Sequence, residues 1–237
     1  MKLSIIIPLY NEQSNILVVL QQLITIRYPD YLTGVEFVIV DDCSSDNSFN
    51  VISEFIKGKP GFLLLKHEIN KGKGAAVKTG IARAEGDVFL VKDSDLELSL
   101  SVIPSMVDAM KMLNDEFTNG SRYLPEIARP LASYKRYWGN KIFTNLTSIL
   151  INVKLSDMAC GYKSIHRNLY QKIIQNENRF GFEAELIIKA LRIKRNNIAE
   201  VLVKYFPRNS GESKKLNNTD GFKILWTIFK YGVLAIK

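Results

Sequence analysis

Short apolar runs alternate with segments of helical periodicity through the first half of the chain. Runs rich in β-branched and other apolar residues predict buried strands at residues 2–7, 35–40 and 88–92 and a further strand at residues 62–66. Between them, apolar residues at helical spacing predict helices at residues 14–24, 46–56 and 75–84, the first capped by Asn11. Alternation with short connections predicts an α/β fold, with a mostly parallel sheet flanked by helices.

The second half continues this pattern less regularly. Further strands are expected at residues 117–120, 162–166 and 198–206, and further helices at residues 169–174 and 183–192. We therefore expect one domain over residues 1–210. Residues 211–237 are expected to form a mobile polar loop and a C-terminal amphipathic helix, packed on that domain or on a membrane surface.

Two longer segments, residues 138–153 and 222–236, combine aromatic and aliphatic residues at helical spacing with flanking lysines. This composition is typical of helices that lie in the headgroup layer of a membrane. Packing against the protein's own sheet is the alternative. No apolar run reaches the about 18 residues that a spanning helix needs, so membrane contact would be peripheral.

Composition indicates a globular protein with a substantial core, because 46% of the 237 residues are hydrophobic and 24% are charged. The formal net charge of +8 arises in residues 189–237, which hold eleven Lys and Arg against three acids. Nucleic acid, membrane headgroups or a phosphorylated substrate would suit this excess, although on charge alone a solvated helix face is the simpler interpretation. Cys43 and Cys160 lack metal-ligand spacing and favour free thiols in a reducing compartment, while the count alone also permits one disulfide.

Acidic residues directly follow two of the predicted strands. Asp93 and Asp95 follow the fourth strand, with Glu97 two residues further on, and Asp41 and Asp42 follow the second. Open α/β sheets bind ligands at the carboxyl ends of their strands. The first pair suits a hard divalent cation that also takes substrate phosphate oxygens, with a solvated acidic turn as the alternative. The second pair suits a ribose, with helix capping as the alternative.

The chain lacks the two commonest phosphate-binding loops. The first strand runs into Pro8-Leu9-Tyr10-Asn11-Glu12 instead of a glycine-rich turn, and the sequence contains no G-x-x-x-x-G-K-[ST]. Side chains are therefore expected to hold a base and a ribose, with Tyr10, Asp41 and Asp42 as candidates.

Several short motifs together carry a family resemblance. The first half contains, in order, Pro8-x-Tyr10-Asn11-Glu12, Val40-Asp41-Asp42-x-Ser44, Asn70-x-Gly72-Lys73-Gly74 and Asp93-x-Asp95. This set resembles the inverting family 2 glycosyltransferases, which implies the GT-A fold, a Rossmann-like nucleotide-diphospho-sugar transferase domain. Motifs in the second half are similar to those of the dolichyl-phosphate mannosyl- and glucosyltransferases. These motifs are Asn119-Gly120-Ser121-Arg122-Tyr123, Asp157-x-x-Cys160-Gly161-Tyr162-Lys163 and Gly181-Phe182-Glu183-x-Glu185-Leu186. Two features depart from that pattern, namely Glu97, where the mannosyl enzymes often have Gln, and the segment Met158-Ala159-Cys160 before Gly161. These departures leave the identity of the transferred sugar open.

The resemblance implies roles for individual residues. The residues that would line the nucleotide pocket are Pro8, Tyr10, Glu12, Asp41, Lys73 and Asp93. The residues that would hold Mg²⁺ or Mn²⁺ on the diphosphate are Asp93, Asp95 and Glu97. The cations that would face the acceptor phosphate are Arg122 and Arg136, and those in a mobile loop closing over the diphosphate are Arg208 and Lys214. Together with Asp95, these four cations form the expected catalytic set.

The sequence thus favours a metal-dependent, inverting glycosyltransferase. It would move a hexose from a GDP- or UDP-linked sugar to a polyprenyl or dolichyl phosphate. The protein would be cytoplasmic and bound peripherally to the cytosolic face of a membrane. No nucleic-acid partner is expected, and the sequence leaves open a membrane-protein partner or a homo-oligomer. A phosphate acceptor is already an anionic nucleophile, so it needs cations to position it and no carboxylate base. The alternatives are a family 2 enzyme acting on a saccharide hydroxyl, and a nucleotide-binding or scaffold protein without turnover.

Overall fold

The first half of the chain forms the regular α/β pattern that its sequence predicts. The computed structural model describes residues 1–124, 133–194, 198–207 and 218–234. The strands of this half are β1 (Lys2–Leu9), β2 (Gly34–Asp41), β3 (Phe62–Lys66) and β4 (Val88–Val91). The helices between them are α1 (Ile16–Thr25), α2 (Ser48–Ile56) and α3 (Lys73–Arg83). Each lies within a few residues of its expected position.

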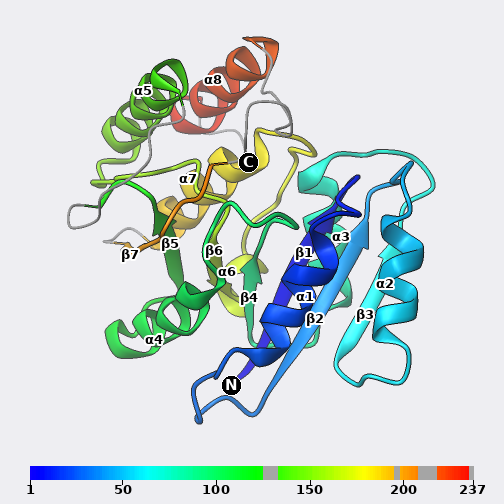
Figure 1. Cartoon of the computed structure of the whole chain (residues 1–237). Coiled ribbons are helices and arrows are strands. Elements are labelled where there is room, and N and C mark those ends of the chain that lie inside the picture. Colours follow the sequence, from blue (N-terminus) through cyan, green and yellow to red (C-terminus); the bar gives the residue numbers. More distant parts are fainter. Residues whose placement is uncertain (125–132, 195–197, 208–217, 235–237) are drawn as a thin grey trace.

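One mixed sheet runs through the described residues. Its seven strands lie in the order β3-β2-β1-β4-β6-β5-β7, where β5 is Phe117–Ser121, β6 is Lys163–His166 and β7 is Ala199–Leu202. Strand β6 pairs antiparallel with both β4 and β5, and the remaining pairs are parallel. The expectation of a mostly parallel sheet flanked by helices is confirmed (Figure 1).

The sheet buries apolar side chains on both faces because successive residues of a strand point in opposite directions. Ile6, Val38 and Val91 enter one core, which α3 and the helix α7 (Phe182–Lys194) cover. Ile5, Ile39 and Leu90 enter a second core, which α1 and α4 (Ile103–Leu113) cover. Burial on both faces explains why these strands are continuous apolar runs.

The remaining described helices are η1 (Leu100–Val102), α5 (Tyr134–Ile151), α6 (Arg167–Tyr170) and α8 (Asn218–Gly232). Figure 1 shows α5 and α8 side by side at the top of the molecule, with α7 beneath them. Among the described residues, none of the helices combines the length and the apolar character that crossing a lipid bilayer requires.

The expectation that Asn11 caps the first helix is wrong. Helix α1 begins after Asn15, and Asn11 adopts a left-handed conformation with φ of 52°. Asparagine enters this region more readily than most residues. The Asn11 side-chain oxygen accepts a hydrogen bond from the backbone N–H of Ser45 at 2.8 Å, so it ties the end of β1 to the loop after β2.

Candidate active site

The ends of β1 and β2 bring four of the expected pocket residues to one edge of the sheet. Pro8 lies in β1 opposite Val40, and Asp41 ends β2 opposite Leu9. Tyr10 and Glu12 follow β1 directly. Because parallel strands end at the same edge, these side chains belong to the region where open α/β sheets bind ligands.

Glu12 and Asp41 are both buried polar residues with hydrogen-bond partners. Glu12 accepts from the side-chain amide of Asn15 at 2.9 Å. Asp41 is fully buried, and its carboxylate accepts from the backbone N–H of Ser44 at 3.2 Å. These contacts hold the two carboxylates in place at the strand ends.

Asp42 organises the glycine-lysine loop that leads into α3. Its carboxylate accepts from the backbone N–H groups of Lys71 at 2.9 Å and Gly72 at 2.7 Å. The same carboxylate lies 2.7 Å from Nδ1 of His67. Sequence reasoning offered Asp42 as a ribose ligand or a helix cap, whereas the structure makes it the support of a loop distant in sequence.

Lys73 joins the two halves of the chain at the end of β4. Its Nζ lies 2.5 Å from Oδ1 of Asp93 and 2.6 Å from Oε1 of Glu183, which belongs to the first turn of α7. Burial alone would lower the pKa of Lys73, but the charges of Asp93 and Glu183 outweigh it and raise that pKa. Conversely, burial would raise the pKa of Asp93, and Lys73 outweighs it and lowers that pKa. Glu183 is a part of the site to which sequence reasoning assigned no role.

A buried lysine supports the turn that carries the two aspartates. Lys92 is inaccessible to solvent, and its Nζ donates to the backbone carbonyl oxygens of Asp93 and Asp95, the latter at 2.6 Å. Burial lowers the pKa of Lys92. The position of Lys92 at the end of an otherwise apolar run is the feature of the sequence that could have indicated this supporting role.

Glycine at position 161 allows β6 to approach this turn. A Cβ built on Gly161 would lie 2.3 Å from Oδ2 of Asp93, closer than any real side chain could come. Gly161 therefore makes room for the Asp93 carboxylate.

The acids after β4 have the donor chemistry of a hard-cation site without forming a complete one. Asp95 Oδ1 accepts from the backbone N–H of Glu97 at 3.1 Å, while Asp93 is paired with Lys73. In the described part of the chain, no three His, Cys, Asp or Glu side chains converge on a metal position. Mg²⁺ typically uses one or two carboxylates, keeps water and takes substrate phosphates, so these carboxylates fit such an ion. The set of Asp93, Asp95 and Glu97 stays a prediction.

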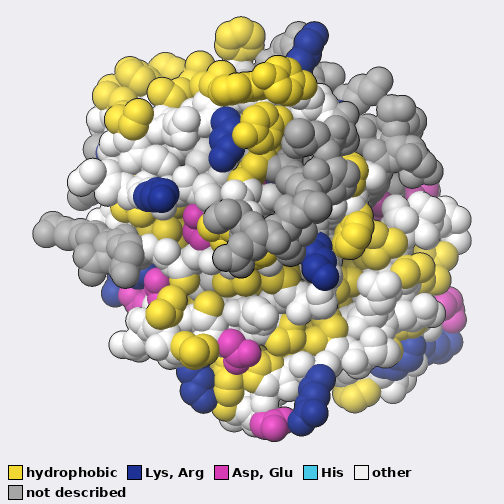
Figure 2. Space-filling model, turned by 60° about the vertical axis from the view of Figure 1, so that its left-hand side comes forward, with side chains coloured by type: hydrophobic (Ala, Val, Ile, Leu, Met, Phe, Trp, Pro, Cys, Tyr) yellow, Lys and Arg dark blue, Asp and Glu magenta, His cyan; other side chains and the backbone are white. Residues whose placement is uncertain are grey.

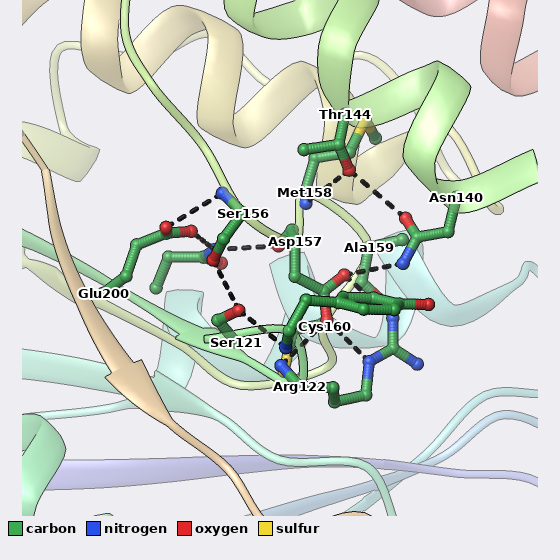
Figure 3. A network of polar contacts seen from close by, with 12 residues as sticks. Ser121, Arg122, Asn140, Thr144, Ser156, Asp157, Met158, Ala159, Cys160 and Glu200 are labelled. Carbon is green, nitrogen blue, oxygen red and sulfur yellow. Dashed lines mark hydrogen bonds and ion pairs between the residues drawn. The ribbon is translucent and has the colours of Figure 1, made fainter. Parts of the chain in front are cut away.

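Arg122 is engaged in an internal ion pair (Figure 3). Its Nε donates to Oδ2 of Asp157 at 2.6 Å, and its Nη2 donates to Oδ1 at 2.9 Å and to the carbonyl of Ala159 at 3.0 Å. Asp157 is fully buried and also accepts from the side chain of Asn140 in α5 at 2.8 Å. Burial would raise the pKa of Asp157, but Arg122 holds it below its usual range. This pair fixes the end of β5 against the segment before β6, and contact of Arg122 with an acceptor stays a prediction.

A second acid extends this network to β7. Glu200 accepts from the backbone N–H of Ser156 at 2.9 Å and from the side chain of Asn119 at 3.0 Å. Figure 3 shows Glu200, Ser156 and Asp157 in one chain of contacts. Hence β5, β7 and α5 are held together beside the site.

The other expected cations are placed differently. Arg136 lies exposed in the first turn of α5, where its backbone N–H donates to the Oγ of the capping residue Ser133 at 3.4 Å. Arg208 and Lys214 lie outside the described residues, as does most of the loop expected to close over the diphosphate.

The family model for glycosyl transferase family 2 matches residues 4–174, most of the chain. The chain belongs to this family. It is therefore a glycosyltransferase, which confirms the enzyme class inferred from the motifs.

Curated members of the family are similar over most of this chain. A dolichyl-phosphate beta-glucosyltransferase of Trichomonas vaginalis is 27% identical over 97% of this chain and 72% of its own length. A dolichol-phosphate mannosyltransferase of Pyrococcus furiosus is 30% identical over 92% of this chain. The chain spans only 60% of the length of the Pyrococcus protein.

Solved structures of other transferases share the fold. Glucosyl-3-phosphoglycerate synthase of Mycobacterium tuberculosis, in complex with Mn²⁺, UDP-glucose and phosphoglyceric acid, superimposes with a TM-score of 0.67 at 16% identity. The match covers 98% of this chain and 79% of that one. The GT-A-like fold expected of a family 2 glycosyltransferase is thereby confirmed.

Proposed function

We propose that this glycosyltransferase moves a hexose from a nucleoside diphosphate sugar to a polyprenyl or dolichyl phosphate, with inversion at the anomeric carbon. The observation that carries the proposal is the cluster of carboxylates and lysines at the ends of β2 and β4, whose charges suit a metal-bound nucleoside diphosphate. The family 2 match and the names of the curated relatives supply the acceptor class.

The donor would bind along the sheet edge. Tyr10 offers an aromatic face for the base, and the buried Asp41 carboxylate offers acceptors for ribose hydroxyls. Pro8 and Glu12 form the adjoining wall, and Lys73 supplies positive charge beside Asp93. A panel of GDP- and UDP-linked sugars distinguishes the two bases.

The chain's own cations would stabilise the leaving diphosphate. Negative charge grows on the leaving group as the sugar bond breaks, and Lys73 is held charged beside that position by Asp93 and Glu183. A divalent ion, Mg²⁺ or Mn²⁺, when bound by Asp95 with Asp93 and Glu97, would supply further positive charge to the diphosphate.

The acceptor phosphate would be positioned by arginines. Arg136 is exposed at the start of α5, and Arg122 lies at the end of β5. Arg208 and Lys214 would join from a closing loop. Since the acceptor is an anion, these cations offset its repulsion from the anionic donor, and no general base is required.

The protein would bind the cytosolic face of a membrane through α5 and α8. Figure 2 shows hydrophobic side chains gathered along the top of the molecule, where Figure 1 places these helices. The exposed apolar residues of α5 are Tyr134, Trp138, Ile142, Leu146 and Ile149, and those of α8 are Phe222, Leu225, Trp226 and Phe229, with Val233 directly after the helix. Aromatic residues on surface helices favour the interfacial layer of a membrane.

The test is a panel of radiolabelled GDP- and UDP-sugars incubated with the full chain, polyprenyl phosphate and Mn²⁺. Label should enter a product that extracts into organic solvent and is released by mild acid. Label found only in water-soluble saccharide would contradict a lipid acceptor and favour transfer to a saccharide hydroxyl. No transfer from any donor to lipid or saccharide would favour a binding protein without turnover.

A further inference from the structure

A cavity of about 580 Å³ lies between residues 176–181 and the first turns of α8, apart from the residues assigned to donor and acceptor. We call it the α8 cavity. Its cationic lining residues are Lys71, Arg179 and Lys223, and its aromatic ones are Phe180, Phe222 and Trp226. Cations and aromatic rings around one opening suit a ligand that carries both an anion and an apolar chain.

The charge of the lining favours an anion. In the described part of the chain, Lys71 and Arg179 have no carboxylate partner, and Lys223 has only Asp220 at 3.9 Å. The acidic lining residue, Glu177, is already engaged, because Lys230 lies 3.3 Å from its Oε1 and the hydroxyl of Tyr231 donates to the same oxygen. An excess of positive charge therefore remains at the opening.

An exposed apolar row leads away from the cavity. Phe222 is 73% exposed and Trp226 is 59% exposed, Phe229 continues the row along the same helix, and Val233 follows directly after the helix ends. Their spacing places them along one side of α8. Tryptophan and phenylalanine next to lysine and arginine are typical of a helix at the level of lipid headgroups.

Buried contacts hold the opposite wall of the cavity in place. Glu185 is fully buried and accepts from the backbone N–H groups of Asn176 at 2.9 Å and Glu177 at 2.7 Å. The backbone N–H of Ala75 donates to the carbonyl of Asn178 at 3.1 Å. This wall is thus fixed to α7 and α3.

The cavity lies on a different side of α8 from α5. A Cβ on Gly232 would lie 2.7 Å from Leu150 of α5, and Gly221 faces Phe143 of α5. These glycines mark the side of α8 that approaches α5, whereas the cavity is lined by Phe222, Lys223 and Trp226. A ligand in the cavity therefore does not need the groove between the two helices.

We propose that the α8 cavity binds the phosphate headgroup of an anionic membrane phospholipid. Arg179 and Lys223 contact the phosphate, Trp226 and Phe222 lie beside the upper part of the acyl chains, and the apolar row enters the interface. This inference rests on the proposed membrane location but does not depend on which acceptor is used. It sets the orientation of the active site relative to the membrane.

The first experiment compares vesicle binding of the full chain and two double variants. Arg179→Gln with Lys223→Gln removes the proposed phosphate contacts. Lys57→Gln with Arg83→Gln removes one lysine and one arginine from exposed positions at the ends of α2 and α3. The first pair should weaken binding to phosphatidylcholine vesicles that contain phosphatidic acid by roughly thirtyfold, since each of the two cations near an anionic surface contributes about 1 kcal/mol. The second pair should bind as the parent chain does, and equal losses in the two variants would overturn the proposal.

The second experiment separates a lipid from a free anion. Hydrogen exchange at residues 176–181 and 222–227 should slow with dihexanoyl phosphatidic acid and stay unchanged with inorganic phosphate at the same concentration. Equal protection by inorganic phosphate, or no protection by the lipid, would overturn the proposal.

A third measurement distinguishes this inference from the proposed function. In detergent, with a short soluble polyprenyl phosphate, the Arg179→Gln/Lys223→Gln variant should transfer sugar at the parental rate. Loss of transfer there, with unchanged vesicle binding, would overturn the headgroup site and assign these residues to catalysis. A parent chain that binds anionic vesicles through the cavity but transfers no sugar would leave the headgroup site standing and would contradict the proposed function.

Discussion

At the scale of single residues, Lys73 connects parts of the chain that are far apart in sequence. It begins α3, yet it pairs with Asp93 after β4 and with Glu183 in α7. About a quarter of its side chain is exposed, so solvent weakens these pairs only in part. Without Lys73, two carboxylates would face one another in a partly buried site.

We expect Lys73→Met to lower the free energy of unfolding by about 1–3 kcal/mol at pH 7, because it leaves two partly buried carboxylates without their cation. The folded pKa of Asp93 is depressed, so its stabilising contribution is present above the unfolded value of about 3.9 and is lost as pH falls through the folded pKa. The difference between parent and variant should therefore shrink below about pH 4. Urea denaturation at pH 7 and pH 3 measures this difference in the free energy of unfolding.

The control is Lys71→Met, which removes an exposed lysine two residues away. An equal loss of stability in the control would contradict the pairing of Lys73.

Asp95 provides the sharpest residue-scale test of the metal. Asp95→Asn should reduce transfer by at least about 100-fold, because it removes a charged ligand beside the diphosphate. It should also weaken binding of Mn²⁺ in the presence of nucleotide, measured by calorimetry, while the melting temperature stays close to that of the parent. Full activity of the parent chain in excess EDTA would contradict a divalent ion.

At the scale of elements, glycines decide where backbones approach closely. We expect Gly161→Ala to destabilise the protein by about 1–3 kcal/mol and to impair donor binding, since its Cβ would collide with the Asp93 carboxylate. Gly139→Ala is the matched control. A Cβ there meets nothing within 4 Å, and alanine in the middle of α5 should stabilise by up to about 1 kcal/mol. Thermal unfolding and nucleotide titration measure both variants, and similar effects of the two changes would contradict the close approach.

The long helices show what periodicity leaves undecided. The sequence pattern of α5 predicts one broad apolar face, but Phe143 and Leu150 pack against the core while Trp138 and Ile149 are exposed. The positions of α5 that are fully covered are Thr144 and Thr147. Spacing can place residues on a helix, but it does not say which side meets the rest of the protein.

At the scale of the whole molecule, the exposed apolar side chains of α5 and α8 and the basic C-terminal region predict reversible membrane binding. The full chain should float with anionic liposomes at low salt, and binding should weaken as salt screens surface charge over about 10 Å at 0.1 M. Alkaline carbonate should release it. Failure to float at low salt would contradict the interfacial location.

Much of the architecture follows from the pattern of apolar and acidic residues along the chain. Continuous apolar runs identified β1, β2 and β4 because a strand buried on both faces has no polar side. The apolar run of β3 identified a strand at the edge of the sheet, where no residue of the strand is fully buried. The acids that follow these runs located the site at the strand ends, because ligands bind there in such sheets. Helix α4 carried no expectation, although Ile103, Met106, Val107 and Met110 stand at helical spacing and Pro104 lies in the first turn.

Which polar groups meet became apparent only from the folded arrangement of the strands and helices. Asp42 supports the loop before Lys73, Arg122 is paired with Asp157, and Lys92 holds the turn of Asp93 and Asp95 from beneath. The Lys92 contacts are local, whereas those of Asp42 and Arg122, like the pairing of Lys73 with Asp93 and Glu183, depend on the order of strands in the sheet and on the packing of α7 and α5. Local pattern specifies the direction of a side chain along its own element, but it does not specify which distant element is folded beside it.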